Sequence, residues 1–65
     1  MNIQKLKAKR VENGYTQVTI AKKIGITSTT YFNKESASVP FNNIEMVKLK
    51  EVLNLTMKDI EEIFF

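Results

Sequence analysis

The stretch TQVTIAKKIGITSTTYFNKE at residues 16–35 decides the fold of this chain. Its apolar residues recur at the three-to-four-residue spacing of one helical face: Ile20, Ala21 and Ile24. Gly25 follows directly and can end this helix in the left-handed conformation, because it carries no Cβ. Thr27 then stands as the N-cap of a second helix. The stretch therefore predicts two short helices, joined by a turn of about three residues that makes them cross.

A repeated capping pattern extends this prediction to the rest of the chain. Before each of the last four expected helices stand an apolar residue and a Thr or Asn cap, with another apolar residue four positions after the cap. These hydrophobic staples are Tyr15, Thr16 and Ile20; Ile26, Thr27 and Tyr31; Phe41, Asn42 and Met46; and Leu55, Thr56 and Ile60. Glu45 and Asp59 resemble the acids of capping boxes. No segment alternates as a strand would, so we expect an all-α fold of five helices.

The remaining helices follow from the same periodicity. The first should run to about Asn13 and end at Gly14, with one face formed by Ile3, Leu6 and Arg10. Residues 36–41 form a loop that contains Pro40. The fourth helix should begin after Asn42, and its expected inner face is Ile44, Val47, Leu49 or the stem of Lys50, and Leu53. The fifth should begin after Thr56 and carry Ile60, Ile63 and Phe64.

Composition narrows the classes of function. Sixty-five residues suit one small domain, 1–65, with a single core. The chain has no cysteine and no histidine, which excludes disulfides, zinc sites with sulfur or imidazole ligands, and Cys/His or Ser/His catalytic pairs. No apolar run is long enough to span a membrane. We therefore expect an intracellular binding domain that is not an enzyme and needs no metal, cofactor or small-molecule substrate.

Charge is distributed unevenly along the chain. The net charge is +3, but residues 1–34 hold seven Lys or Arg against Glu12 alone, whereas residues 35–65 hold three against six acids. A basic half that contains two crossing helices suits a surface that faces nucleic-acid phosphates, with the acidic half turned away or toward another protein. For Lys5, Lys7 and Lys9, a solvated helix face is an equal alternative.

From Leu6 to about Ile60 the sequence resembles the Cro/CI-type helix-turn-helix family, the lambdoid phage repressors and their XRE-like relatives. The most specific part of the match is the TQ-x-x-IA-x-x-IGIT pattern from Thr16 to Thr27. Further matching positions are Leu6, Arg10, Gly14, Thr30, Tyr31, Glu35, Phe41, Ile44 and Leu53, with NLT at residues 54–56. The resemblance implies a compact five-helix, lambda-repressor-like fold whose second and third helices bind DNA.

The resemblance also assigns roles to the third helix. Ser28, Thr29, Phe32 and Asn33 occupy the outward positions that face the major groove in the family. Asn33 can pair with adenine through two hydrogen bonds, and Phe32 can contact a thymine methyl group. We therefore expect a site that favours A·T pairs. The alternatives for Phe32 are a place in the core or a contact with a partner protein.

Four other residues are expected to lie near the DNA backbone. Gln17 opens the second helix, where its amide and the free N–H groups can hold a phosphate, and Thr27 caps the recognition helix. Lys34 stands where the family has an aliphatic residue and is expected to reach toward a phosphate. In the family an arginine at the position of Arg10 pairs with an acid at that of Glu35, so Arg10 is read as structural first and as phosphate-binding second.

Two features bear on affinity and assembly. The family usually has Asn-Gly-Lys after the recognition helix, but this chain has Ser36, Ala37 and Ser38, so phosphate contacts from that loop are doubtful. Phe64 and Phe65 either complete the core or form part of a homodimer interface. A two-fold dimer would read a pseudo-palindromic operator in double-stranded DNA.

The sequence thus favours a transcriptional regulator of phage or mobile-element type, and a repressor in particular. It would place residues 27–35 in the major groove of an operator, in the cytoplasm of a bacterial host. One alternative is a protein-interaction module on the same fold, an antirepressor or antitoxin, in which Phe32 and the loop 36–38 face a protein. Another is an accessory factor that bends DNA during recombination.

Overall fold

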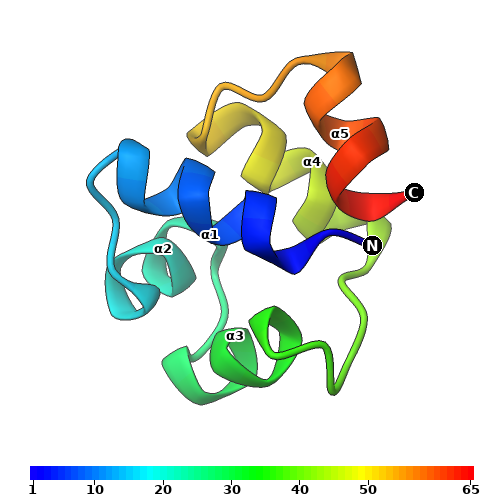
Figure 1. Ribbon diagram of the computed structural model, residues 1–65. Coiled ribbons are helices and arrows are strands. Elements are labelled where there is room, and N and C mark those ends of the chain that lie inside the picture. The colour runs from blue at the N-terminus through cyan, green and yellow to red at the C-terminus, as the bar shows by residue number, and fades with distance from the viewer.

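The computed structural model describes residues 1–65. It contains five helices and no strands. Helix α1 crosses the middle of the molecule, with α2 and α3 on one side and α4 and α5 on the other, and the two termini lie close together (Figure 1). The helices are α1 (Ile3–Glu12), α2 (Gln17–Ile24), α3 (Ser28–Glu35), α4 (Asn43–Val52) and α5 (Met57–Phe64). The expected all-α, five-helix fold is confirmed.

Side-chain caps fix where each helix begins. Asn2, Thr16, Thr27, Asn42 and Thr56 each accept a hydrogen bond from the backbone N–H three residues later. The capping boxes expected at the last two helices are present. A third box, not expected from the sequence, begins α2, where the hydroxyl of Thr19 accepts from the N–H of Thr16 at 2.8 Å. One cap is worth about 1 kcal/mol, so together they are a substantial part of the stability of so small a fold.

The turn between α2 and α3 has the predicted glycine conformation. Gly25 has φ 79°, and the N–H of Ile26 reaches back to the carbonyl of Ala21 at 3.0 Å while that of Gly25 reaches Lys22 at 3.3 Å. This pair of bonds is a Schellman motif, which satisfies the last carbonyls of α2. The short turn holds α3 against α2 at a fixed crossing.

The core is built where the five helices meet. Tyr31 and Phe41 pack with ring centres 5.9 Å apart, and Phe41 meets Phe64 edge-on at the same separation. Phe64 is therefore a core residue, whereas Phe65 is 83% exposed. The other buried apolar residues are Leu6, Ile20, Ala21, Ile24, Leu49, Leu53, Leu55 and Ile63.

The expected inner face of α4 was partly wrong. Leu49 and Leu53 are buried, but Ile44 is 68% exposed and Val47 is 54% exposed. Glu45 takes the inward position one turn before Leu49, because its carboxylate both caps the N–H of Asn42 and pairs with a lysine of α3. At 100° per residue, this phase leaves Ile44 and Val47 on the outer side of the helix.

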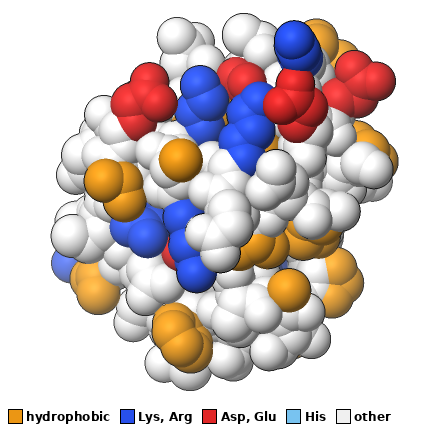
Figure 2. Space-filling view, viewed as in Figure 1, with side chains coloured by type: hydrophobic (Ala, Val, Ile, Leu, Met, Phe, Trp, Pro, Cys, Tyr) orange, Lys and Arg blue, Asp and Glu red, His pale blue; other side chains and the backbone are white.

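Ion pairs join α1 to α5. Lys5 contacts Asp59 at 3.1 Å and Glu62 at 2.6 Å, and Lys9 lies 3.8 Å from Asp59. Basic and acidic side chains accordingly lie side by side over α1 and α5 (Figure 2). The N–H of Thr56, and then the ammonium of Lys5, lower the pKa of Asp59 from 3.8 to about 2. Two of the three α1 lysines therefore face acids of the same chain.

The lowered pKa of Asp59 predicts one component of acid sensitivity. Its carboxylate favours the folded state above about pH 4, and this contribution is lost as the pH falls toward 2. Urea unfolding of Asp59→Asn should therefore give lower stability than wild type near neutral pH and converge with it near pH ~2. Glu61→Gln, at an exposed position without an ion pair, should run parallel to wild type. Curves for Asp59→Asn and wild type that stay parallel would contradict the assignment.

The loop after α3 predicts a stabilising change. Ala37 has φ 68°, which is strained for a residue with a Cβ and free for glycine. Ala37→Gly should raise the free energy of unfolding by about 1 kcal/mol, because relief of strain exceeds the added chain entropy. Ala8→Gly, on the exposed face of α1, should lower it by about 1 kcal/mol. Destabilisation by both changes in urea titrations would refute the strain at Ala37.

Candidate nucleic-acid interface

The outer side of α3 presents the four side chains expected to read bases. Ser28, Thr29, Phe32 and Asn33 are all exposed, and Phe32 is 54% exposed. The opposite side of α3 carries Tyr31 and Glu35, one turn apart and both buried. The surface over α3, at the bottom of Figure 2, is mostly uncharged and shows no acidic side chains. The four residues thus share one exposed side of a short helix.

A buried carboxylate fixes the other side of α3. Glu35 is fully buried, and Arg10 of α1 donates to it twice, from Nε at 3.0 Å and from an Nη at 3.2 Å. Gln17 of α2 donates to it from Nε2 at 3.1 Å, and the hydroxyl of Tyr31 donates to its other oxygen. One side chain therefore connects α1, α2 and α3. The pairing with Arg10 was predicted, whereas the contacts from Gln17 and Tyr31 were not.

Each partner of Glu35 is itself held in place. Arg10 also donates from Nη1 to the carbonyl of Tyr15 at 2.8 Å, so its guanidinium is committed inside the chain. Burial, and then the hydrogen bond to Glu35, raise the pKa of Tyr31 far above its usual value, which keeps its phenol a donor. No buried side-chain polar atom lacks a hydrogen-bond partner. Arg10 is thus placed as a structural residue.

The N-terminus of α2 lies beside this cluster. Gln17 is the first residue of α2 and is half-buried because its amide nitrogen points to Glu35. Thr16 caps the N–H of Thr19, which leaves the N–H groups of Gln17 and Val18 without a partner in the helix. Such groups, at the positive end of the helix dipole, can bind a phosphate oxygen.

Thr27 and Lys34 are both engaged within the chain. The hydroxyl of Thr27 accepts a hydrogen bond from the N–H of Thr30 at 3.1 Å and donates one to the hydroxyl of Thr30 at 2.7 Å. Thr27 therefore caps α3. The ammonium of Lys34 pairs with Glu45 of α4 and both side chains are largely buried. The expectation that Lys34 reaches toward a phosphate is therefore corrected: Glu45 holds it on the inner side.

The surroundings of Glu45 favour its ionised form despite its burial. Burial alone would raise the pKa of Glu45, but the hydrogen bonds from Lys34 and from the N–H of Asn42 outweigh it and lower that pKa. The pair ties the last turn of α3 to the first turn of α4. It also explains how a lysine replaces the aliphatic residue that the family usually has at this position.

The loop after α3 contains a left-handed turn, although it lacks the Asn-Gly-Lys sequence that is usual in the family. Ala37 adopts the left-handed conformation, and the hydroxyl of Ser36 donates to the carbonyl of Asn33 at 2.9 Å. No basic side chain stands at residues 36–38. The exposed lysines without an acidic partner lie elsewhere, at Lys22 and Lys23 of α2 and at Lys48 and Lys50 of α4.

The Glu35 cluster predicts a large loss of stability when Arg10 is replaced. Arg10→Met should lower the free energy of unfolding by about 3 kcal/mol, because the buried carboxylate loses its counter-charge. Lys7→Met, on the same helix but without an ion pair, should change it by less than about 0.5 kcal/mol. Both can be compared by urea titration followed by circular dichroism. Equal effects of the two changes would show that the cluster contributes little.

Comparison with known proteins agrees with this geometry. The model of the Helix-turn-helix family matches residues 6–60, which is most of the chain and includes all of α2, α3 and α4. Searches of curated proteins and of solved structures gave no match. None of the five helices has the length and hydrophobicity of a membrane span, and no group of acidic side chains is arranged to hold a metal ion. The chain therefore belongs to the helix-turn-helix family of the Cro/CI type, a family of DNA-binding regulators.

Proposed function

We propose that this protein is a transcriptional repressor of phage or mobile-element type that places α3 in the major groove of an operator. The observation that carries the proposal is the exposure of Ser28, Thr29, Phe32 and Asn33 on one side of α3, while Glu35 fixes the opposite side to α1 and α2. A helix held so firmly can enter the groove without losing its orientation. Repression follows by excluding polymerase from the occupied operator.

The chemistry of the exposed side chains sets the kind of sequence read. The Asn33 amide pairs with adenine through N6 and N7, and Phe32 packs on a thymine methyl group. Ser28 and Thr29 each supply single hydrogen bonds. None of the four is Arg or Lys, which make the commonest bidentate contact with guanine. The operator is therefore rich in A·T pairs where α3 contacts it.

Backbone contacts come from the first turn of α2. Gln17 and the free N–H groups beside it take a phosphate, and Thr27 adds a contact from the cap of α3. Arg10 and Lys34 are omitted from this set, because their charges pair with Glu35 and Glu45. With few cations near the groove, a monomer binds weakly. A homodimer on two half-sites about 34 Å apart, in the bacterial cytoplasm, supplies the missing affinity.

A protein-interaction module is the second candidate function. Phe32 is half-exposed on α3, and the four outward positions carry no charge. Such a surface also suits an apolar protein partner, as in an antirepressor or antitoxin. Phe32→Ala separates the two functions, because the DNA proposal requires loss of operator binding, whereas the interaction module requires loss of partner binding with DNA affinity unchanged.

The proposal is tested by titrating the protein into the intergenic DNA beside its own gene, with a scrambled duplex as the control. We expect preference for the native DNA. The logarithm of the binding constant should fall linearly with the logarithm of the salt concentration, with a slope that counts the phosphates neutralised by Lys and Arg side chains. Binding that is absent, or equal for both duplexes, would reject operator recognition. A DNA-bending factor would instead bind both duplexes and shorten the end-to-end distance measured by energy transfer.

Two substitutions should give different patterns of loss on such an operator. Asn33→Ala should weaken binding by about 1 to 3 kcal/mol and relax specificity at one base pair. Gln17→Ala should weaken binding to all sequences to a similar extent and leave the salt slope unchanged, because the amide carries no charge. Circular dichroism must first show both variants folded, since Gln17 also donates to Glu35. Indistinguishable losses across native and scrambled sites would refute these roles.

A further inference from the structure

Asn13 and Gly14 form the Asn-Gly pair of this chain, and they lie at the junction between α1 and α2. The other asparagines, at residues 2, 33, 42, 43 and 54, are each followed by a larger residue. Both residues of the pair are exposed. Asn13 is the most reactive asparagine by this sequence criterion, because no side chain on the next residue hinders attack by its backbone nitrogen.

The reaction at such a pair is intramolecular deamidation. The backbone nitrogen of Gly14 attacks Cγ of Asn13, so a C–N bond forms while the bond from Cγ to Nδ2 breaks. Nδ2 takes the proton of the Gly14 N–H and leaves as ammonia. Water then opens the five-membered imide at either of its carbonyls, which gives aspartate or isoaspartate. Water is the sole co-reactant, and no group is oxidised or reduced.

The folded chain holds both reacting groups in hydrogen bonds. The N–H of Gly14 donates to the carbonyl of Val11 at 2.9 Å. Nδ2 of Asn13 donates to the carbonyl of Lys9 at 2.8 Å and lies 3.5 Å from that of Leu53, the C-cap of α4. The reaction therefore requires the junction to open, and its rate reports how often this local opening occurs.

The fold requires the glycine that makes Asn13 reactive. Gly14 has φ 79°, in the left-handed region that a residue with a Cβ adopts only with strain. The N–H of Tyr15 reaches back to the carbonyl of Arg10 at 3.0 Å, which closes a Schellman motif at the end of α1. The turn from α1 into α2 therefore brings a reactive pair with it.

Deamidation removes the contacts that Asn13 makes with two helix ends. A carboxylate at position 13 accepts hydrogen bonds but cannot donate them, so the bond to Lys9 and the contact with Leu53 are lost. The new negative charge stands beside Glu12 and at the C-terminal ends of α1 and α4, where the helix dipole disfavours an anion. In isoaspartate the backbone also gains one carbon, which lengthens the junction before α2.

The junction also bears on the cluster around Glu35. The carbonyl of Tyr15, two residues after Asn13, accepts a hydrogen bond from Arg10 at 2.8 Å. Gln17 then begins α2 and donates to Glu35. A longer and negatively charged junction therefore moves the first turn of α2 relative to α1 and α3.

We propose that Asn13 is a site of spontaneous deamidation, that opening of the α1–α2 junction sets its rate, and that the product loosens α2 from α1 and thereby weakens DNA binding. Only this last effect rests on the proposed function. The chain thus carries its own slow route to inactivation, which needs neither a protease nor a second protein.

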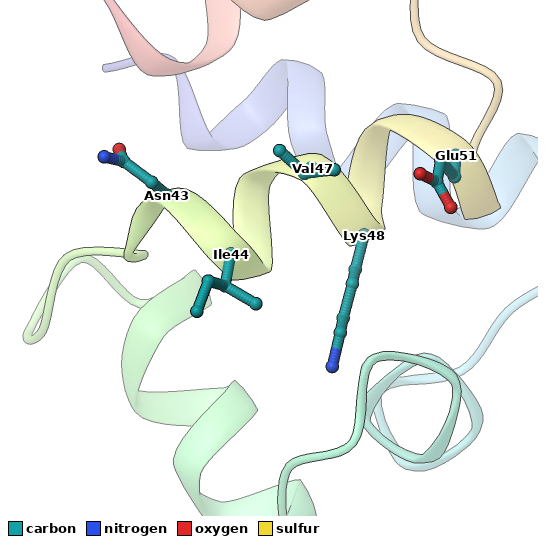
Figure 3. A pocket seen from close by; sticks show the side chains of 5 residues that line it. All are labelled: Asn43, Ile44, Val47, Lys48 and Glu51. Atoms are coloured by element: carbon teal, nitrogen blue, oxygen red, sulfur yellow. The ribbon is translucent and has the colours of Figure 1, made fainter.

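The first experiment follows deamidation by mass. The full chain is held in mildly alkaline buffer, sampled over time, digested and analysed by tandem mass spectrometry. We expect a gain of about 1 Da confined to the peptide that contains Asn13, as a mixture of aspartate and isoaspartate. In urea above the unfolding midpoint the reaction should be at least about tenfold faster. Asn43 is the internal control: its side chain projects from the start of α4 (Figure 3) and Ile44 follows it, so it should stay intact.

The second experiment measures the effect of the product. Asn13→Asp should unfold at a lower urea concentration than wild type. Asn43→Asp makes the same change in the first turn of α4, where the helix dipole favours an anion, so it should unfold at an equal or higher concentration. Wild type aged until half deamidated should lose affinity for the native duplex. Asn13→Gln, which cannot close the five-membered ring, should keep its starting affinity through the same ageing.

Several outcomes would overturn the proposal. These are no gain of mass at Asn13, an equal gain at Asn43, equal rates in buffer and in urea, or an Asn13→Asp chain as stable as wild type. Failure of the proposed function is distinguishable, because mass and unfolding are measured without DNA. A chain that deamidates at Asn13 but prefers no operator leaves the modification site intact. An aged chain that keeps full affinity for its operator rejects only the effect on DNA binding.

Discussion

The buried carboxylate of Glu35 is the constraint on which the arrangement of the first three helices depends. A charge without access to water must be compensated within the chain, and four hydrogen bonds from Arg10, Gln17 and Tyr31 do so. Because these partners lie on α1, α2 and α3, compensating one charge also orients three helices. The outward side of α3 is therefore determined by what its inward side must bind.

Pairing of basic side chains with acids of the same chain also limits how the protein can bind DNA. Arg10, Lys34, Lys5 and Lys9 pair with acids of the same chain. The basic N-terminal half is therefore less available to phosphates than its composition suggests. In the function proposed above, recognition would therefore rely on neutral hydrogen-bonding groups, on helix N-termini and on the spacing of two half-sites, all of which depend on geometry more than on net charge.

Most of the fold could be predicted from the sequence because it depends on local signals. The rest depends on contacts between residues that are far apart in the sequence. The caps at Thr27 and Asn42 and the turn at Gly25 depend on residues within one helical turn, so they could be predicted. The family match bears out the helix-turn-helix unit, whereas the base and phosphate contacts stay predictions. Periodicity groups Phe64 with Ile60 and Ile63, but the contact of Phe64 with Phe41 depends on residues far apart in sequence. The hydrogen bond from Gln17 to Glu35 also joins distant residues, and periodicity holds no information about it.

The contacts of α4 explain why the hydrophobic pattern predicted the wrong inner face for this helix. Its apolar residues surround the helix, so hydrophobic pattern alone cannot fix the phase, and the deciding contact is polar: Lys34 makes it favourable to bury Glu45. With the acid turned inward, Ile44 and Val47 are turned outward. A fold that buries a charged side chain and exposes two branched apolar ones on the same helix loses hydrophobic stabilisation unless the outer side is covered. The ion pair between Lys34 and Glu45 on the inner side of α4 and the exposed Ile44 and Val47 on its outer side are thus two consequences of the same helix phase.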